Sequence, residues 1–147
     1  MRRFPAGVAV VTVVSEGRGL GLTVGSLVSL SLEPPLVGMS IGNGSILHTP
    51  LRDAGRFAVS LLAGDQEAIA QHFARNAPPI ALWEGIPARE SELPEPLVDG
   101  ALAWLECRVT GEHPAGDHTV FVGEVRWIEL GRAGPALAYV GGGYASL

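Results

Sequence analysis

The stretch Gly21–Pro35, GLTVGSLVSLSLEPP, decides the fold, because it predicts a strand that turns into an unusual loop. Gly21 and Gly25 would let a ligand approach the backbone closely, and Pro34–Pro35 end the element. Short hydroxyl donors with little side-chain bulk suit a large planar ligand with a carbonyl edge and a phosphate tail. The alternative is an ordinary edge strand with a serine-rich turn. Four hydroxyls lie within nine residues, at Thr23, Ser26, Ser29 and Ser31.

The composition predicts one domain, residues 1–147, with an ample core, since 47% of the residues are hydrophobic. Only 17% are charged, so we expect a second copy of the chain to cover some apolar surface, as in a homodimer. The net charge of −5 argues against nucleic acid and against an anionic membrane as partners.

The chain has no lysine, which excludes a Schiff-base lysine and a Walker-type phosphate lysine. Any phosphate must be held by arginine, backbone amides or hydroxyls. Cys107 is the single cysteine, so an intrachain disulfide and a cysteine-rich metal site are excluded.

Arg2–Arg3 followed by the apolar run Val8–Val14 superficially resembles a signal peptide. Pro5 and Gly7 interrupt the pattern and no small-residue cleavage site follows, so a buried strand is the better interpretation. No run approaches the ~18 apolar residues that span a bilayer. A cytoplasmic protein is expected.

The rest of the chain predicts mainly strands with two short helices. We expect Ser45 to cap the first helix and Asp65 the second, with Gly55 ending the first. Six or seven mostly antiparallel strands can close into a barrel, which removes their edges; a β-sandwich is the competing architecture. The expected strands are Gly7–Val14, Leu20–Leu30, Leu36–Ile41, Arg56–Leu62, Ala101–Glu112, His118–Leu130 and Ala136–Val140, and the expected helices are Ile46–Asp53 and Gln66–Ala74.

Charge predicts the register of the long hairpin formed by residues 101–112 and 118–130. Two ion pairs then lie on one face and apolar residues on the other, whereas a slip of one residue would put charges into the apolar face. Cys107 is therefore a small buried hydrophobe and not a nucleophile. The predicted cross-strand pairs are Glu106 with Arg126, Arg108 with Glu124, Leu105 with Trp127, and Cys107 with Val125.

Residues 75–100 contain five prolines, and a segment of this kind is usually a lid, a wrapping arm or a disordered loop. We expect it to lie across a partner subunit or over a site, with Leu82 and Trp83 as its apolar anchor. The sequence contains no HExxH, CxxC, GxSxG or P-loop motif, and its histidines lack metal-ligand spacing. An enzyme without evident acid or base residues usually takes its chemistry from a cofactor.

Five motifs in a fixed order resemble the flavin reductase-like family, whose members have an FMN-binding split barrel. The likeness covers nearly the whole chain and is nearest to the small reductase components of two-component flavin monooxygenases. The motifs are FPAGVAVVTV, the hydroxyl-rich stretch ending in Pro34–Pro35, Leu61–Leu62 with Gln66 and Phe73, GALAWLEC (Gly100–Cys107), and GDHTVFVGEV (Gly116–Val125) with Tyr139 and Tyr144.

The resemblance implies a dimeric, six-stranded antiparallel Greek-key split barrel with short flanking helices, and flavin near the subunit interface. His118 would orient the nicotinamide ring; capping of its turn is the alternative role. Arg75 would add charge at the phosphate, or else complement the helix dipole. The residues implied for flavin binding are Thr23, Val24, Gly25, Ser26, Leu30, Ser31, Ser40, Ile41, Gly42, Ser45, Ile46 and Arg75.

The activity implied is hydride transfer from NADH or NADPH to FMN, or alternatively FAD, with reduced flavin passing to a separate oxygenase. Gly42–Gly44 lacks the basic residue often found before the phosphate-contacting serine, which leaves the choice of flavin open. Two other functions compete: a flavin-binding electron-transfer or sensor protein without NAD(P)H turnover, and a split-barrel oxidase of a pyridoxal-type phosphate. The absence of lysine disfavours the oxidase.

Overall fold

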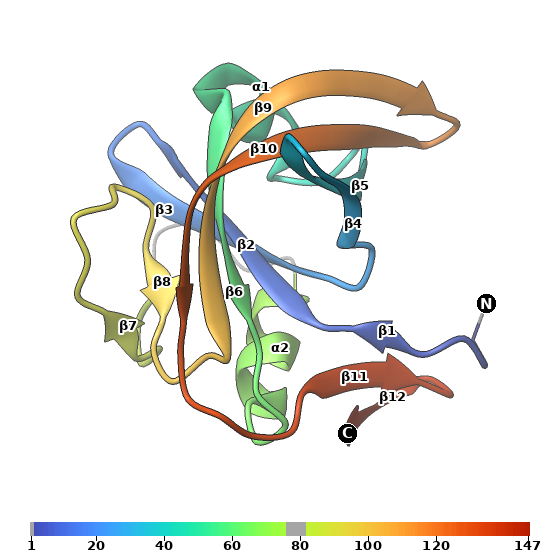
Figure 1. The fold of residues 1–147 in the computed structure, drawn as a ribbon, viewed down its shortest axis with the longest axis vertical. Coiled ribbons are helices and arrows are strands. Elements are labelled where there is room, and N and C mark those ends of the chain that lie inside the picture. The colour runs from blue at the N-terminus through green and yellow to red at the C-terminus, as the bar shows by residue number, and fades with distance from the viewer. Residues whose placement is uncertain (1, 76–81) are drawn as a thin grey trace.

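The computed structural model describes residues 2–75 and 82–147, and its backbone is mainly β with two short helices (Figure 1). The principal sheet is antiparallel throughout, in the order β3-β2-β6-β9-β10-β5-β4. Its strands are β2 (Ala9–Ser15), β3 (Arg18–Val24), β4 (Val28–Leu32), β5 (Pro35–Gly42), β6 (Arg56–Leu61), β9 (Ala103–Ala115) and β10 (His118–Leu130).

Two smaller sheets and two helices complete the described chain. A three-stranded sheet joins the N-terminal arm to a C-terminal hairpin, whose second strand the sequence did not predict. None of the helices within residues 2–75 and 82–147 is long and apolar enough to cross a membrane. The elements are β1 (Ala6–Gly7), β11 (Leu137–Val140), β12 (Gly143–Ser146), β7 (Ala88–Arg89), β8 (Leu97–Val98), α1 (His48–Ala54) and α2 (Glu67–Phe73).

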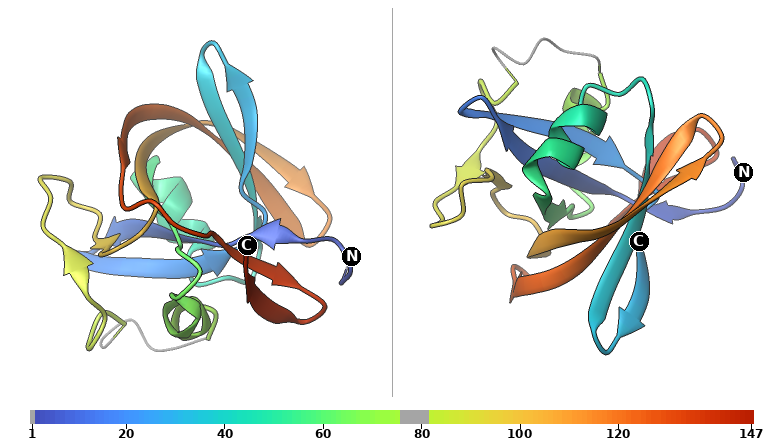
Figure 2. Two further views of the ribbon diagram at one scale, coloured as in Figure 1. Left: turned by 60° about the horizontal axis from the view of Figure 1, so that its bottom comes forward. Right: turned by 90° about the horizontal axis from the view of Figure 1, so that it is seen from above.

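The two edge strands of the principal sheet, β3 and β4, follow each other in the chain and are joined only by residues 25–27. Four Cα steps span at most ~15 Å, so the two edges meet at this corner and the sheet curls (Figure 2). The prediction of one strand over Leu20–Leu30 is wrong, because the chain turns at residues 25–27 and forms two strands, β3 and β4. The principal sheet therefore has seven strands rather than six. Within the described residues no ladder joins β3 to β4, and barrel closure stays a prediction.

Strand β2 is buried on both faces, as its continuous apolar run predicted. Val11 and Val13 belong to the core inside the curl of the sheet, together with Phe57. Val10 packs on the other face in the cluster that contains Phe73 of α2. This alternation confirms the interpretation of residues 8–14 as a buried strand.

The β9–β10 hairpin confirms two of the predicted cross-strand pairs. Arg108 lies opposite Glu124, and their side chains form an ion pair at 2.7 Å. Cys107 lies opposite Val125 and is fully buried. Burial raises the pKa of the Cys107 thiol to about 12, as expected for a core residue that stays protonated.

The other two predicted pairs are wrong, because the register shifts between Val125 and Trp127. Arg126 is the extra residue of this bulge, so Glu106 faces Trp127 instead, and Leu105 faces Ile128. The Arg126 guanidinium turns to Glu124 of its own strand at 3.3 Å. Glu106 lies 3.6 Å from Arg56 of β6.

The ends of the helices are only partly as predicted. Ser45 does not cap α1, because Leu47 occupies the N-cap position and no side chain caps the helix. The Ser45 hydroxyl accepts the Leu47 N–H at 3.2 Å in the turn before the helix. Gly55 ends α1 with φ of 65°, as predicted. Asp65 does not cap α2, since its carboxylate pairs with Arg132. Gln66 occupies the cap position, and its side chain accepts the N–H of Ala63 at 3.0 Å.

The described part of the proline-rich segment, residues 82–100, packs against the protein's own strands. The Thr12 hydroxyl donates to the Pro96 carbonyl at 2.9 Å. Glu95 is buried and pairs with Arg56 at 2.8 Å. Leu82 is buried, and the Trp83 ring lies against an α2 aromatic, which confirms the expected anchor. This part does not hang free, and its position relative to a partner subunit or a site stays a prediction; residues 76–81 are outside the described chain.

Candidate functional site

Three adjoining hollows form one concave surface beside the corner where β3 passes to β4, which we call the Gly25 groove. Their volumes are about 620, 510 and 250 Å³. Tyr139 lines all three, and Gly25 and Ala6 line two of them. The N-terminal arm, the end of α2 and the β11–β12 hairpin form its other sides. The two larger hollows each lie in the range of about 300–1,000 Å³ that ligand pockets usually have.

The groove contains five of the predicted flavin-binding residues: Thr23, Val24, Gly25, Ser26 and Arg75. Two of their hydroxyls are already used by the fold. Thr23 donates to the Ala70 carbonyl of α2 at 2.7 Å. Ser26 donates to the Ser40 carbonyl at 3.0 Å and accepts the Ser40 N–H at 3.1 Å. A ligand here therefore meets backbone and small side chains rather than a row of free hydroxyls.

The two glycines of this stretch have different roles. A Cβ at Gly21 would lie 2.7 Å from the Phe73 ring, so Gly21 makes room for α2 and not for a ligand, contrary to the sequence interpretation. A Cβ at Gly25 would come no closer than 3.4 Å to its nearest neighbour, the Ala6 methyl. Gly25 is exposed in the groove, where a flat ligand can approach the backbone.

Two tyrosines form the aromatic side of the groove. The Tyr139 and Tyr144 rings meet edge to face, with centroids 5.2 Å apart. Burial raises the pKa of the Tyr144 hydroxyl, and the neighbouring Tyr139 raises it further. Both rings present apolar surface suited to a fused ring system.

Five more of the predicted flavin-binding residues lie near the turn between β9 and β10, in a region that we call the His118 corner (residues 40–48 and 116–119). They are Ser40, Ile41, Gly42, Ser45 and Ile46. His118 lies opposite Gly42 across the β5–β10 ladder. Its Nδ1 is 2.7 Å from a carboxylate oxygen of Asp117, and this hydrogen bond lowers the pKa of Asp117. The Ile41 side chain is buried in the core, so only its backbone can reach a ligand, and the half-buried Ile46 follows Ser45 in the turn before α1.

Leu30 and Ser31 lie on β4, outside both the Gly25 groove and the His118 corner. Leu30 covers Gly38 of β5, where a Cβ would be 2.8 Å from its side chain. Ser31 lines a hollow of about 350 Å³ between β4 and β10, together with Trp127. Neither residue lines the hollows of the Gly25 groove within the described chain.

Arg75 and Ser45, both predicted to meet one phosphate, are not brought together. Arg75 follows α2 and lines the groove beside Glu67 and Gln71. The turn with Ser45 precedes α1, and the two helices lie toward opposite ends of the molecule's long axis (Figure 1). Within one chain, Arg75 lies in the groove and Ser45 lies at the His118 corner.

The sequence interpretation missed two parts of the site. One is the N-terminal arm, where Phe4 and Ala6 line the groove. The other is a polar network through His48, Asn43 and Thr119 at the His118 corner. No sequence spacing indicates this network, because its members lie on three separate elements.

The groove on this curled antiparallel sheet has a shape and lining that would suit a flat, nucleotide-like ligand. Its lining combines small residues, the tyrosine pair and the Arg75 charge. Among residues 2–75 and 82–147, no three His, Cys, Asp or Glu side chains gather as metal ligands.

Sequence comparison identifies the family. The model of the flavin reductase-like domain matches residues 1–147, so the chain belongs to that family. It is 42% identical to the reductase component of 4-hydroxyphenylacetate 3-monooxygenase from Thermus thermophilus, over 100% of this chain and 92% of that protein. It is 38% identical to an NADH-dependent flavin reductase from Rhodococcus, over 95% of this chain and 78% of that protein.

Solved structures agree in fold. The NADH:FAD oxidoreductase of Streptomyces globisporus superposes with a TM-score of 0.92 at 36% identity, covering 99% of this chain and 87% of that one. The same oxidoreductase has also been solved with NAD and FAD fragments. The mainly β architecture with two short helices is therefore that of flavin reductases.

Proposed function

We propose that this protein is an NADH-dependent flavin reductase, and that it supplies reduced FMN or FAD to a separate monooxygenase component. The observation that supports it most directly is the Gly25 groove, whose open backbone and paired tyrosines fit a fused three-ring system. Relatives matched over nearly the whole chain are named as NADH-dependent reductases, and one is a monooxygenase reductase component.

The chain's own residues bind and orient. The flavin, when bound, supplies the two-electron acceptor for the hydride that NADH gives up. The backbone of residues 23–26 and the Tyr139 ring hold the rings and exclude water, and Arg75 supplies charge for a phosphate. Within one chain the Gly42–Ile46 segment lies at the His118 corner, apart from Arg75, so its contact with the flavin phosphate stays a prediction.

His118 acts on the nicotinamide side. Its Nδ1 is held by Asp117 at 2.7 Å, which fixes the ring plane, and its side chain is about half exposed at the end of β10. In this position the imidazole can hold the nicotinamide against the flavin. Orientation of this kind, rather than acid or base catalysis, accelerates a transfer between two bound partners.

An anaerobic mixing experiment tests the proposal. Purified protein, flavin and NADH are combined without oxygen, and the visible absorbance of oxidised flavin is followed. Loss of that absorbance at a rate proportional to protein is expected. A yellow protein that keeps its colour with both NADH and NADPH would identify the electron-transfer or sensor alternative. Parallel runs with FMN, FAD and the two nicotinamides decide the preferred pair.

We propose further that the protein is a homodimer. Exposed apolar side chains gather on the edge strand β4 and on the end of β10, among them Leu32 and Leu130, which are 89% and 79% exposed. Such a surface is larger than scattered single residues on a monomer. Analytical ultracentrifugation should give twice the chain mass, and Leu32→Glu should shift the mass to that of one chain.

A further inference from the structure

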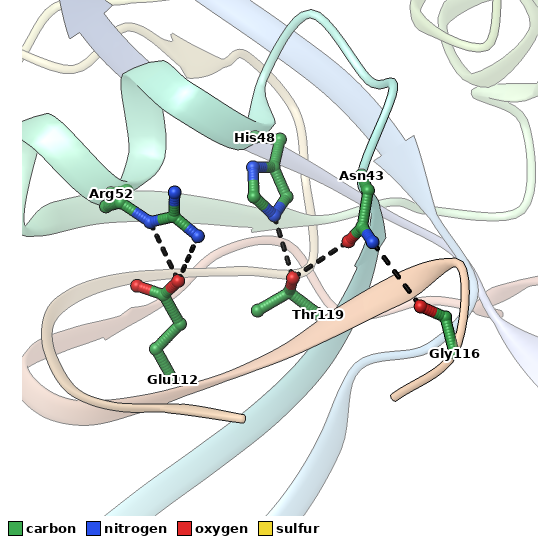
Figure 3. A network of polar contacts seen from close by, with 6 residues as sticks. All are labelled: Asn43, His48, Arg52, Glu112, Gly116 and Thr119. Carbon is green, nitrogen blue, oxygen red and sulfur yellow. Dashed lines mark hydrogen bonds and ion pairs between the residues drawn. The ribbon is translucent and has the colours of Figure 1, made fainter. Parts of the chain in front are cut away.

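A polar network connects α1, the turn before it and the start of β10 (Figure 3). His48, on α1, is 7% exposed, and its Nε2 is 2.8 Å from the Thr119 hydroxyl. The Thr119 hydroxyl donates to Asn43 Oδ1 at 2.9 Å. Asn43 Nδ2 donates to the Gly116 carbonyl at 3.4 Å. The network thus runs from a helix to the turn that precedes His118.

The direction of each hydrogen bond follows from the chemistry of its members. The Gly116 carbonyl can only accept, so the Asn43 amide nitrogen faces it and Oδ1 faces Thr119. The threonine hydroxyl has a single proton, which Oδ1 takes. Nε2 of His48 must therefore carry the proton and donate to Thr119. The network specifies one tautomer of His48, and that tautomer keeps Asn43 directed at the turn.

Backbone contacts join the same parts. The Asn43 N–H donates to the Asp117 carbonyl at 2.9 Å, and Gly42 pairs with His118 across the ladder. One helical turn beyond His48, Arg52 of α1 forms an ion pair with Glu112 of β9. The helix therefore holds both strands of the hairpin from one face, close to its turn (Figure 3).

We propose that His48, Thr119 and Asn43 are positioning residues for the reductase reaction. They hold the Gly116–His118 turn so that the His118 imidazole keeps its place beside the nicotinamide. They do not touch the reacting atoms. The inference rests on the proposed function, in which His118 orients NADH, and it assigns roles to three residues that are neither among the predicted site residues nor in the groove.

Thr119→Val tests the proposal with little change of shape, because it removes the hydroxyl and both of its hydrogen bonds. We expect kcat/KM for NADH to fall about tenfold, the effect of losing two net hydrogen bonds. Thr119→Ser keeps the hydroxyl and should stay within about threefold of wild type. Thr110→Val is the matched control, since its exposed hydroxyl, 3.4 Å from the Val122 carbonyl, lies in the same hairpin away from the turn; it should leave the rate unchanged.

A double-mutant cycle separates positioning from general loss of structure. In a His118→Ala background, Thr119→Val should change kcat/KM by less than about twofold, since the two residues act through one another. Hydrogen exchange gives a readout that needs no activity: the Asn43 amide should exchange faster in Thr119→Val than in Thr110→Val.

The outcomes are distinguishable. A wild-type protein that does not oxidise NADH in the presence of flavin removes the proposed function, while the exchange rates still report whether the network holds the turn. An active wild type with a full tenfold loss in both backgrounds would overturn the positioning role. So would unchanged kinetics and exchange in Thr119→Val.

Discussion

The Gly25 groove and the His118 corner are built in opposite ways. The groove exists because side chains are missing: Gly25 has none, and Thr23 and Ser26 turn their hydroxyls to the protein's own backbone. The corner exists because side chains are present and paired, from His48 through Thr119 to the turn. Under the proposed function, the groove should determine whether the flavin rings bind, whereas the corner should determine how the second reactant is oriented.

Filling the groove should have the largest effect. Gly25→Phe projects a ring toward the N-terminal arm and occupies the space of the ligand. We expect the Kd of flavin to rise at least about 100-fold, equivalent to ~2.7 kcal/mol, as measured by flavin fluorescence quenching. Thr110→Phe, at an exposed position of the β9–β10 hairpin outside the Gly25 groove, is the control and should bind normally.

Truncation of His118 at the corner should have the second largest effect. His118→Ala should lower the rate of flavin reduction about 30-fold, equivalent to ~2 kcal/mol, because NADH loses its orientation. The flavin Kd should change less than about twofold. Stopped-flow absorbance and fluorescence titration measure the two quantities. If flavin affinity falls as much as the rate, the proposed division of labour between groove and corner is incorrect.

Substitution of Gly21 can be compared with substitution of Gly25, because Gly21 faces the Phe73 ring and Gly25 faces the groove. Gly21→Ala places a methyl against the Phe73 ring, and overpacking of this kind should cost about 1.5 kcal/mol of unfolding free energy. Flavin affinity of the folded protein should be unaffected. Urea unfolding followed by tryptophan fluorescence, beside flavin titration at low urea, checks both statements.

Arg75 gives a smaller, ligand-dependent effect. Arg75→Ala should raise the Kd of FMN about fivefold, equivalent to ~1 kcal/mol for one exposed charge pair. Riboflavin, which has no phosphate, should bind wild type and variant alike. Equal weakening for both ligands would show that Arg75 shapes the groove instead of meeting a phosphate.

The smallest effect is a pH dependence at the corner. The hydrogen bond with His118 lowers the pKa of Asp117 in the folded protein. A lowered folded pKa adds stability above the ordinary carboxyl pKa, and that contribution is lost as the pH falls through the folded value. In His118→Ala the Asp117 pKa should return toward its ordinary value, which carboxyl NMR titration can follow. An unchanged titration would mean that another group holds the carboxylate.

The local pattern of apolar and charged residues was sufficient to predict much of the fold. The apolar run of residues 8–14 and the charges of the long hairpin identified β2 and the pairing near Cys107. The bulge at Arg126 was not predictable, because pairing Glu106 with Arg126 looked equally satisfactory in the sequence. The division of Leu20–Leu30 into two strands was not predictable either, because the apolar side chains of β4, although exposed, continue the apolar pattern of β3.

The candidate site agrees with the sequence prediction in position where a motif is continuous, and departs from it where the fold brings distant residues together. Residues 23–26 lie in the groove as one segment, and Gly42 meets His118 through strand pairing. His48 and Thr119 are 71 residues apart in sequence, and Asn43 and Thr119 are 76 apart. The β5–β10 ladder and the turn that leads into α1 together bring these three side chains close.

The three residues between β3 and β4 have a consequence for how such a protein can diversify. They both join the edges of the sheet and line the groove, so a longer or bulkier connection would disturb folding and binding at once. The opposite side of the groove is a short arm and a terminal hairpin, neither of which belongs to the principal sheet. Tolerance for a larger or smaller flavin nucleotide should therefore evolve at the two chain ends.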